Sequence, residues 1–503
     1  MAANLSCLLD RLPNSDNKIN ALNEISTLIS SLDRSAIAEV LPNISLNVIF
    51  ECLDTQEDVQ LETCVGVLDK LLDSMSGLTL LDQHEAEVSL ALEHPYKPLR
   101  LLALKQVMKA AEENIHSIVS SHSGLILALS QMNFVPELDV AKKAAQVLLM
   151  TGSIPEGLEA LLLGNSFDSL QAALNSNDST MKFRSYELLV DLSRYSEEAL
   201  SAVSSRGVLH QLLNELQGDD VLAKLNCLEL MSRLATCQHG LRFLEYSGII
   251  ESVQQMLHQS GVLMGLLLPG LITFLGQMAA NKPECLNTNY QPFINTVFGA
   301  LESDDTSLMG VAVETIGVIG SSAAGKTALQ KQGNRMSSAC NVLGQLIRSS
   351  PDLKTRALEC LASLLSFKGE EASSELLSIT QQWFSLLTRT PTETLNLLNQ
   401  STTNPELTVH CAVLRVYQCL AILPWAQVLL NSHPGFNEYL IDRSTENTKE
   451  GKEMKFAIVK ALVDSPTAMD VFGRVYFVRL REFINEGAFY IRVESSVAFE
   501  SAE

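Results

Sequence analysis

The feature that most constrains this chain is a helical repeat of about 40 residues. A polar residue or Pro followed by an apolar residue marks the start of a long helix, and this start recurs at Asp58, Pro98, Asp139, Thr180 and Asp220. The intervals between these positions are 40, 41, 41 and 40 residues. Further starts follow less regularly, near Val262, Thr306, Asp352, Glu406 and Glu453. Because several starts keep one period, the chain is built from repeated units.

The segment Leu216–Leu257 shows how one unit is organised. Apolar residues at helical spacing predict one buried helix face, and they are Leu225, Leu228, Met231 and Leu234. Gly218-Asp219-Asp220 supplies turn and N-cap residues before this helix. A turn at Cys237-Gln-His-Gly240 ends it, and Gly248 separates two further short helices. Such a unit cannot bury its apolar faces alone, so it needs a neighbour on each side.

A period of 40 to 47 residues built from helices is typical of armadillo and HEAT proteins. We therefore predict an all-α, armadillo/HEAT-like α-solenoid, a right-handed superhelix of stacked helical repeats. The predicted segments are N-terminal capping helices (1–50), armadillo/HEAT-like repeats (51–367), irregular C-terminal repeats with longer loops (368–474) and a C-terminal tail with a disordered end (475–503). A non-repetitive all-α protein is the alternative, and the constant period argues against it.

The charge balance limits the class of partner. Acidic residues outnumber basic ones by 58 to 36, which gives a formal net charge of −22. Nucleic acid is therefore a poor partner, since its phosphates require Lys and Arg. A partner with a basic surface suits the chain better, although the acidity can equally serve solubility alone.

The cysteines and the N-terminus indicate the compartment. None of the ten Cys residues forms a C-x-x-C pair, so we expect no metal site and no redox motif. Free cysteines on apolar helix faces, such as Cys64 and Cys227, fit a reducing compartment. The first residues lack a basic segment and include Asp10, so they do not resemble a signal peptide. We expect a cytoplasmic location, with the nucleus as a second one.

One motif suggests an enzyme. Gly320-Ser-Ser-Ala-Ala-Gly325-Lys326-Thr327 matches the phosphate-binding P-loop pattern. A P-loop follows a buried strand, but the preceding run Leu308–Ile319 has helical spacing and occupies the long-helix position of a repeat. We therefore interpret the motif as the turn after that helix. No metalloprotease or serine-hydrolase motif is present, and we expect neither enzymatic activity nor a cofactor.

A second segment suggests a membrane span. Val262–Ala280 contains no charged residue, and its 19 residues approach the length that crosses a bilayer. Pro269 and three glycines interrupt it, and it occupies a repeat position between Asp220 and Thr306. We interpret it as a buried central helix pair and expect no membrane contact.

The repeat also predicts a binding face. In armadillo-like solenoids the last helix of each repeat lines the concave groove, where positions four residues apart face the groove together. The predicted partner-binding residues are Lys105, Lys109, Glu187, Asp191, Glu229, Arg233, Gln277, Glu314 and Glu359. The acids among them would form an acidic ladder beside a basic patch at Lys105 and Lys109. A solvated face of stacked amphipathic helices is the equally weighted alternative.

Several longer strings carry a family resemblance across nearly the whole chain, least clearly in residues 1–50. They are Met309-Gly-Val-Ala-Val-Glu-Thr-Ile-Gly317 with Gly325-Lys326 and Leu329-Gln-Lys331, Pro424-Trp-Ala-Gln427, Pro434-Gly-Phe436 with Glu438-Tyr439, Asp442-Arg-Ser444, Phe472-Gly473, Leu480-Arg481, and Gly487 with Tyr490. In these strings the chain resembles the family of chaperones that assemble the base of the 26S proteasome regulatory particle.

The resemblance implies a function and partners. Such a chaperone holds the C-terminal domain of one ring ATPase, regulatory subunit 7. It forms an intermediate with the regulatory subunit 4 ATPase and non-ATPase subunit 2, and leaves before the particle is complete. The family is not known for enzymatic activity. The alternative is an armadillo-like transport or scaffolding adaptor, although an import receptor would carry Trp and Asn arrays and this chain has only Trp383 and Trp425.

Overall fold

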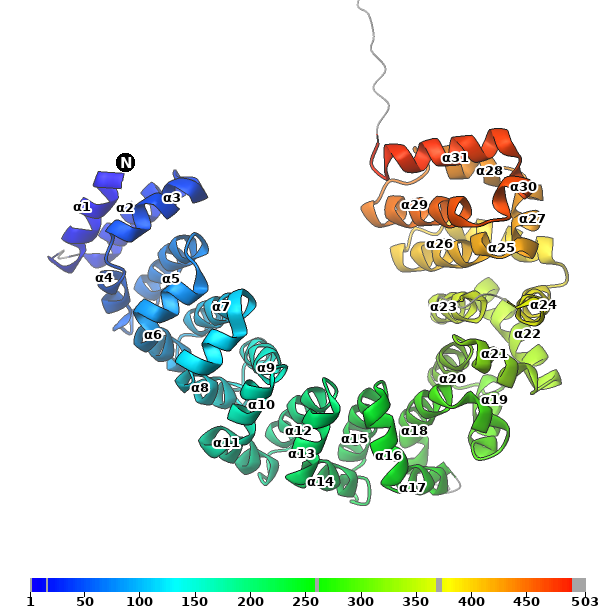
Figure 1. Cartoon of the computed structure of the whole chain (residues 1–503), viewed down its shortest axis with the longest axis horizontal. Helices are drawn as coiled ribbons and strands as arrows, with labels where there is room; N and C mark the ends of the chain where they lie inside the picture. Colours follow the sequence, from blue (N-terminus) through cyan, green and yellow to red (C-terminus); the bar gives the residue numbers. More distant parts are fainter. Residues whose placement is uncertain (1, 15–16, 258–261, 368–372, 491–503) are drawn as a thin grey trace, which may run out of the picture. The chain divides into compact units, whose positions relative to one another are not determined.

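The computed structural model describes residues 2–14, 17–257, 262–367 and 373–490. Within these ranges all regular secondary structure is helical, with 31 α-helices, four short 3-10 helices and no strand (Figure 1). The chain divides into two compact units, residues 1–243 and 244–503, and the boundary falls within α16 (Gln238–Tyr246). The predicted all-α class is confirmed.

Unit 1 begins with short helices. They are α1 (Ala2–Arg11), η1 (Leu12–Asn14), α2 (Lys18–Ser30), α3 (Arg34–Val40), η2 (Leu41–Asn43), α4 (Asn47–Phe50) and η3 (Glu51–Leu53). Helix α2 packs on the first long helix, and its Leu22, Ile25 and Ile29 are buried. These helices thus cover one end of the first repeat.

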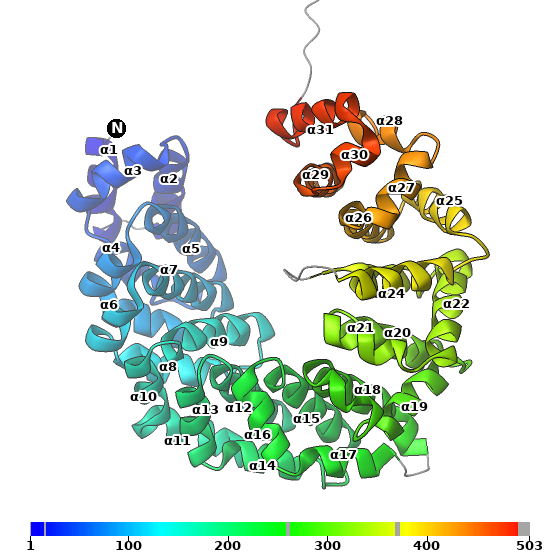
Figure 2. The same ribbon diagram turned by 45° about the vertical axis from the view of Figure 1, so that its right-hand side comes forward.

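The repeats of unit 1 form two layers. In one layer each long helix contacts the next: α5 (Asp58–Asp73), α7 (Lys97–Ser121), α9 (Leu138–Gly152), α12 (Ser179–Ser193) and α15 (Val221–Leu234). The other layer holds α6 (Gly77–Glu93), α8 (Gly124–Met132), α10 (Pro155–Leu162), α11 (Gly164–Leu174), α13 (Glu197–Ser205), α14 (Val208–Glu215) and α16. Two views show α12 and α15 side by side, with α14 below them (Figure 1, Figure 2). The five predicted starts lie within one residue of the observed ones.

Local chemistry explains these boundaries. The Asp220 side chain accepts hydrogen bonds from the backbone N–H groups of Leu222 (2.9 Å) and Ala223 (3.2 Å), which caps the N-terminus of α15. Asp178 caps α12 in the same way. The apolar stripe of α15 packs inward, since Leu228, Met231 and Leu234 are buried.

Unit 2 continues the arrangement. Its helices are α17 (Ile249–Leu257), α18 (Val262–Asn281), η4 (Pro283–Asn287), α19 (Gln291–Leu301), α20 (Thr306–Ile319), α21 (Ala323–Gln330), α22 (Asn334–Ser349), α23 (Lys354–Leu365), α24 (Ser374–Ser385), α25 (Pro391–Thr402), α26 (Leu407–Ile422), α27 (Pro424–Ser432), α28 (Phe436–Ile441), α29 (Lys449–Asp464), α30 (Ala468–Phe472) and α31 (Arg474–Glu486). Helices α18, α20, α23, α26, α29 and α31 contact one another in that order and form its long-helix layer. The segment predicted as a tail from residue 475 begins with α31, and its predicted disordered end lies outside the described residues.

The uncharged segment forms one helix rather than the predicted pair. Met264–Asn281 of α18 is long and apolar enough to cross a membrane. Helix α18 nevertheless packs against α17 and α20, and its Leu271, Phe274 and Leu275 are fully buried. This burial is typical of a core helix. Pro269 lies inside it and lacks an N–H group, which accounts for the sequence resembling a helix break.

Candidate functional site

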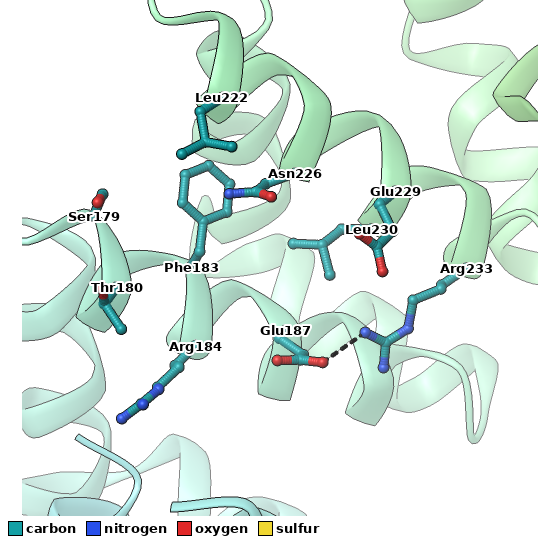
Figure 3. Close-up of a pocket in the computed structure, with 10 residues that line it drawn as sticks. All are labelled: Ser179, Thr180, Phe183, Arg184, Glu187, Leu222, Asn226, Glu229, Leu230 and Arg233. Carbon is teal, nitrogen blue, oxygen red and sulfur yellow. Dashed lines mark hydrogen bonds and ion pairs between the residues drawn. The ribbon is translucent and has the colours of Figure 1, made fainter. Parts of the chain in front are cut away.

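The candidate site lies on the exposed surface of α9, α12 and α15, which we call the long-helix face. A groove of about 320 Å³ runs between α12 and α15 (Figure 3). Its lining residues are Ser179, Thr180, Phe183, Arg184, Glu187, Leu222, Asn226, Glu229, Leu230 and Arg233. Three of the predicted site residues, Glu187, Glu229 and Arg233, are therefore brought together here.

The groove has an apolar end and a charged end. At one end Phe183 faces Leu222, with Asn226 beside the ring (Figure 3). Leu222 is 63% exposed, although it is a large apolar side chain. At the other end Glu187 meets Arg233. Such a groove offers both an apolar contact and a charged contact to a partner.

The charged end is an ion-pair cluster between neighbouring repeats. Arg233 Nη1 lies 2.8 Å from Glu187 Oε1, and its Nη2 contacts Asp191. Burial alone would lower the pKa of Arg233, but the hydrogen bond to Glu187 and the charge of Asp191 outweigh it and raise the pKa. Asp191 also pairs with Arg194 at 3.2 Å. Glu187 and Asp191 are thus held by arginines of the chain itself.

A second groove of about 280 Å³ lies beside the first, between α9 and α12. It is lined by Asn133, Leu138, Ala141, Lys142, Ala145, Gln146, Leu149, Arg184, Glu187, Leu188 and Asp191. Arg184 and Glu187 line both grooves, so α12 forms the ridge between them. Arg184 donates to the carbonyl oxygens of Asn133 (3.4 Å) and Val135 (2.6 Å), which holds its guanidinium at the end of α8.

The predicted basic patch forms internal contacts with the preceding repeat. Lys105 Nζ lies 2.7 Å from carboxylate oxygens of both Asp69 and Asp73 on α5. Burial opposes the charge of Lys105, yet these hydrogen bonds raise its pKa. Lys109 Nζ donates to the carbonyl oxygens of Leu72 (3.1 Å) and Asp73 (3.3 Å), where it caps the C-terminus of α5, and burial lowers its pKa. Both lysines stabilise repeat stacking.

The remaining predicted residues belong to unit 2. Gln277 is half-buried on α18, whereas Glu314 and Glu359 are exposed on α20 and α23. Glu314 pairs with Arg356 of the next long helix at 3.2 Å. Glu359 has no ion-pair partner within the described ranges, and the same holds for Glu229 of unit 1. The predicted ladder therefore contains paired and unpaired acids.

Several lining residues are absent from the sequence prediction, above all Leu138, Phe183 and Leu222. Leu222 precedes Leu225 by three residues, so the sequence pattern places it in the buried stripe. In the structure it lies in the first turn of α15 and is exposed. Leu138, 55% exposed, begins α9 in a comparable position. Both leucines share a place in the first turn of a long helix, but the sequence carries no signal that they are exposed.

The P-loop-like motif has a structural role. Gly320 ends α20, and Ser322 caps α21 by accepting a hydrogen bond from the Gly325 N–H at 3.0 Å. Lys326 is fully buried, and its Nζ donates to the carbonyl oxygens of Gly320 (2.7 Å) and Ser366 (2.8 Å). The ammonium group therefore binds helix ends and does not face an open phosphate site. The part of the chain that the structure describes also contains no cluster of three metal-ligating side chains.

Comparisons with known proteins cover the whole chain. A family profile described as "Proteasome non-ATPase 26S subunit" matches residues 1–503. The chain is 32% identical to the 26S proteasome non-ATPase regulatory subunit 5 of Homo sapiens over 508 residues, and 33% identical to that of Bos taurus, with 100% of both chains covered in each case. The Drosophila melanogaster protein of that name is 22% identical over 505 residues, with 98% of this chain and 96% of its own covered.

One solved structure supports the fold. The "Kap95:Nup1 complex" covers 95% of this chain and 64% of its own chain, with a TM-score of 0.59 at 13% identity. A likeness at this identity concerns the fold alone. It agrees with an armadillo/HEAT-like helical solenoid.

Proposed function

The chain belongs to the family of 26S proteasome non-ATPase regulatory subunit 5, and we propose that it is a chaperone for assembly of the base of the proteasome regulatory particle. In this proposal it binds the C-terminal domain of the regulatory subunit 7 ATPase. The regulatory subunit 4 ATPase and non-ATPase subunit 2 join the same intermediate, and the chain leaves before the particle is complete. Full-length similarity to relatives of that name carries the proposal.

The long-helix face is the proposed contact surface of unit 1, with Glu187, Asp191, Glu229 and Arg233 as candidate residues. Lys105 and Lys109 on α7, and Gln277, Glu314 and Glu359 of unit 2, remain separate candidates for partner binding. Its grooves combine exposed leucines with charged side chains, which suits a partner that must later be released. The net charge of −22 favours a basic partner surface. The proposed mechanism is steric and electrostatic: the bound face of the ATPase domain stays shielded until its mature neighbour displaces the chain.

The proposed role needs no enzymatic activity, nucleotide or other cofactor, metal, nucleic acid or membrane. The buried position of Lys326 supports this absence of nucleotide chemistry. Its proposed location is the cytoplasm. The nucleus is proposed as a second location, because the chain would be found where its partner particle is assembled.

An armadillo-like transport or scaffolding adaptor is the second candidate, supported by the fold shared with the Kap95 chain. An import receptor of the Trp-array type is disfavoured, because Trp383 is buried and donates to Gln330 Oε1 at 2.8 Å. Trp425 is half-buried, and its indole N–H lies 3.3 Å from Thr380 Oγ1. Neither indole offers an open stacking surface.

Co-purification with the isolated C-terminal domain of the regulatory subunit 7 ATPase, at low and high salt, tests the proposal. We expect a stoichiometric complex that salt weakens, because screening reduces the attraction between opposite charges. A complex insensitive to salt would still support the chaperone function and would indicate that the contact surface is apolar. No complex at either salt concentration would favour the adaptor.

A further inference from the structure

The two grooves of the long-helix face share one construction. Each lies between neighbouring long helices, and each has an exposed leucine from the first turn of a helix at its rim, Leu138 in one and Leu222 in the other. Both also contain Arg184 and Glu187 of the ridge helix α12. Each groove therefore offers a partner one apolar side chain to bury beside charged groups.

We propose that the two grooves form one docking site for a single α-helix of the partner, which lies across α9, α12 and α15 and places apolar side chains seven residues apart in the two grooves. This inference rests on the proposed function, because it specifies how the chain holds a folded partner domain. It adds the secondary structure, side-chain spacing and charge pattern of the bound segment.

The spacing of the grooves favours a helix over a strand. Packed helices lie about 8–10 Å apart, so two successive grooves are separated by about the same distance. Residues seven apart on one face of an α-helix are separated by about 10.5 Å. In an extended strand, residues on one face are two or four apart, which corresponds to about 7 or 13 Å. The helix spacing comes closest to the separation of the two grooves.

The unpaired charges give the bound helix a direction. Lys142 is exposed on α9, and Glu229 is exposed on α15. Neither has an ion-pair partner among the residues that the structure describes, whereas Glu187 pairs with Arg233. The long-helix face is therefore positive over α9 and negative over α15. A complementary helix carries an acidic residue at the end over α9 and a basic residue at the end over α15.

The first test replaces the exposed leucines in the full-length chain. We expect Leu138→Ser and Leu222→Ser each to weaken binding of the regulatory subunit 7 ATPase C-terminal domain about tenfold, since each leucine is buried only in the complex. Val59→Ser is the matched control: Val59 is 56% exposed in the first turn of α5 and lines neither groove. It should leave affinity unchanged within about twofold. Thermal unfolding of each variant checks that the fold is retained.

The second test reads the geometry directly by photo-crosslinking with p-benzoylphenylalanine in place of Leu138 or Leu222. Leu138 lies on α9 and Leu222 on α15, with α12 between these two helices. We therefore expect both crosslinks on one face of one partner helix, about 7 to 14 residues apart. The acidic end of that helix should crosslink at position 138. Crosslinks on a strand, or on two separate segments, would overturn the proposal.

The outcomes separate the two proposals. If the wild-type chain binds the domain but both serine variants bind equally well, the helix site is wrong and the proposed function stands. If the wild-type chain does not bind the domain at all, the proposed function fails, and the helix proposal fails with it.

Discussion

At the scale of single residues, two buried lysines, Lys326 and Lys455, affect the stability of the fold. Lys326 ties two repeats together, because the carbonyl groups of Gly320 and Ser366 lie at the ends of α20 and α23. We expect Lys326→Ala to lower the free energy of unfolding by about 2–4 kcal/mol, because both carbonyl groups lose a charged donor. Lys331→Ala, at an exposed position, should change it by less than about 0.5 kcal/mol. Denaturant unfolding measures both. Saturable ATP binding abolished in a stable Lys326→Ala variant would contradict this account.

The burial of Lys455 predicts that the free energy of unfolding depends on pH. Its side chain is only 2% exposed, and burial lowers its pKa from the usual 10.5 to about 8. Between pH 8 and 10.5 the unfolded chain therefore binds more protons at this group than the folded chain. Its contribution to the free energy of unfolding rises with pH across this window, by about 3 kcal/mol in total.

The comparison of wild type with Lys455→Met isolates this effect. The difference in unfolding free energy, wild type minus variant, should increase from pH 7.5 to 10.5. Lys460→Met, on the exposed side of the same helix, is the matched control. A difference that stays constant over this range would show that the lysine carries no penalty for burial.

At the scale of helices, the N-caps set the boundaries that the repeat predicts. We expect Asp220→Ala to weaken the first turn of α15 by about 1 kcal/mol, because two backbone N–H groups lose their acceptor. Amide hydrogen exchange in this turn should become about fivefold faster. Asp219→Ala changes an exposed neighbour outside the cap and serves as the control. Equal exchange rates in both variants would refute the cap assignment.

The helix starts could be predicted because each depends on residues adjacent in sequence, as Asp220 and Val221 are. The exposure of Leu222 could not, since its three-residue spacing to Leu225 matches a buried stripe. The extent of the neighbouring helix determines which residues of the stripe are covered. Helix α18 shows the same limit, because Pro269 resembles a break in sequence yet packing keeps the helix continuous.

At the scale of the whole molecule, the repeat period predicted the solenoid, and the longer strings predicted the family. The charge pairing of the candidate site could not be predicted. Arg233 finds its partners 46 and 42 residues earlier, at Glu187 and Asp191, one repeat away. The sequence of one helix predicts which acidic residues share a face, but it does not predict which basic residue of the next repeat pairs with them. In the structure, Glu187, Asp191 and Glu314 of the predicted acidic ladder pair with arginines of the following repeat. Glu229 and Glu359 have no ion-pair partner among the described residues.

We propose that this chain acts in assembly of the regulatory-particle base and leaves before the particle is complete. The most direct measurement is quantitative mass spectrometry of native complexes, separated by size from cells that express the tagged full-length chain. We expect the chain in a complex with the regulatory subunit 7 and subunit 4 ATPases and non-ATPase subunit 2, and its loss from the complete 26S particle. Stoichiometric retention of the chain in the complete particle would contradict the chaperone account.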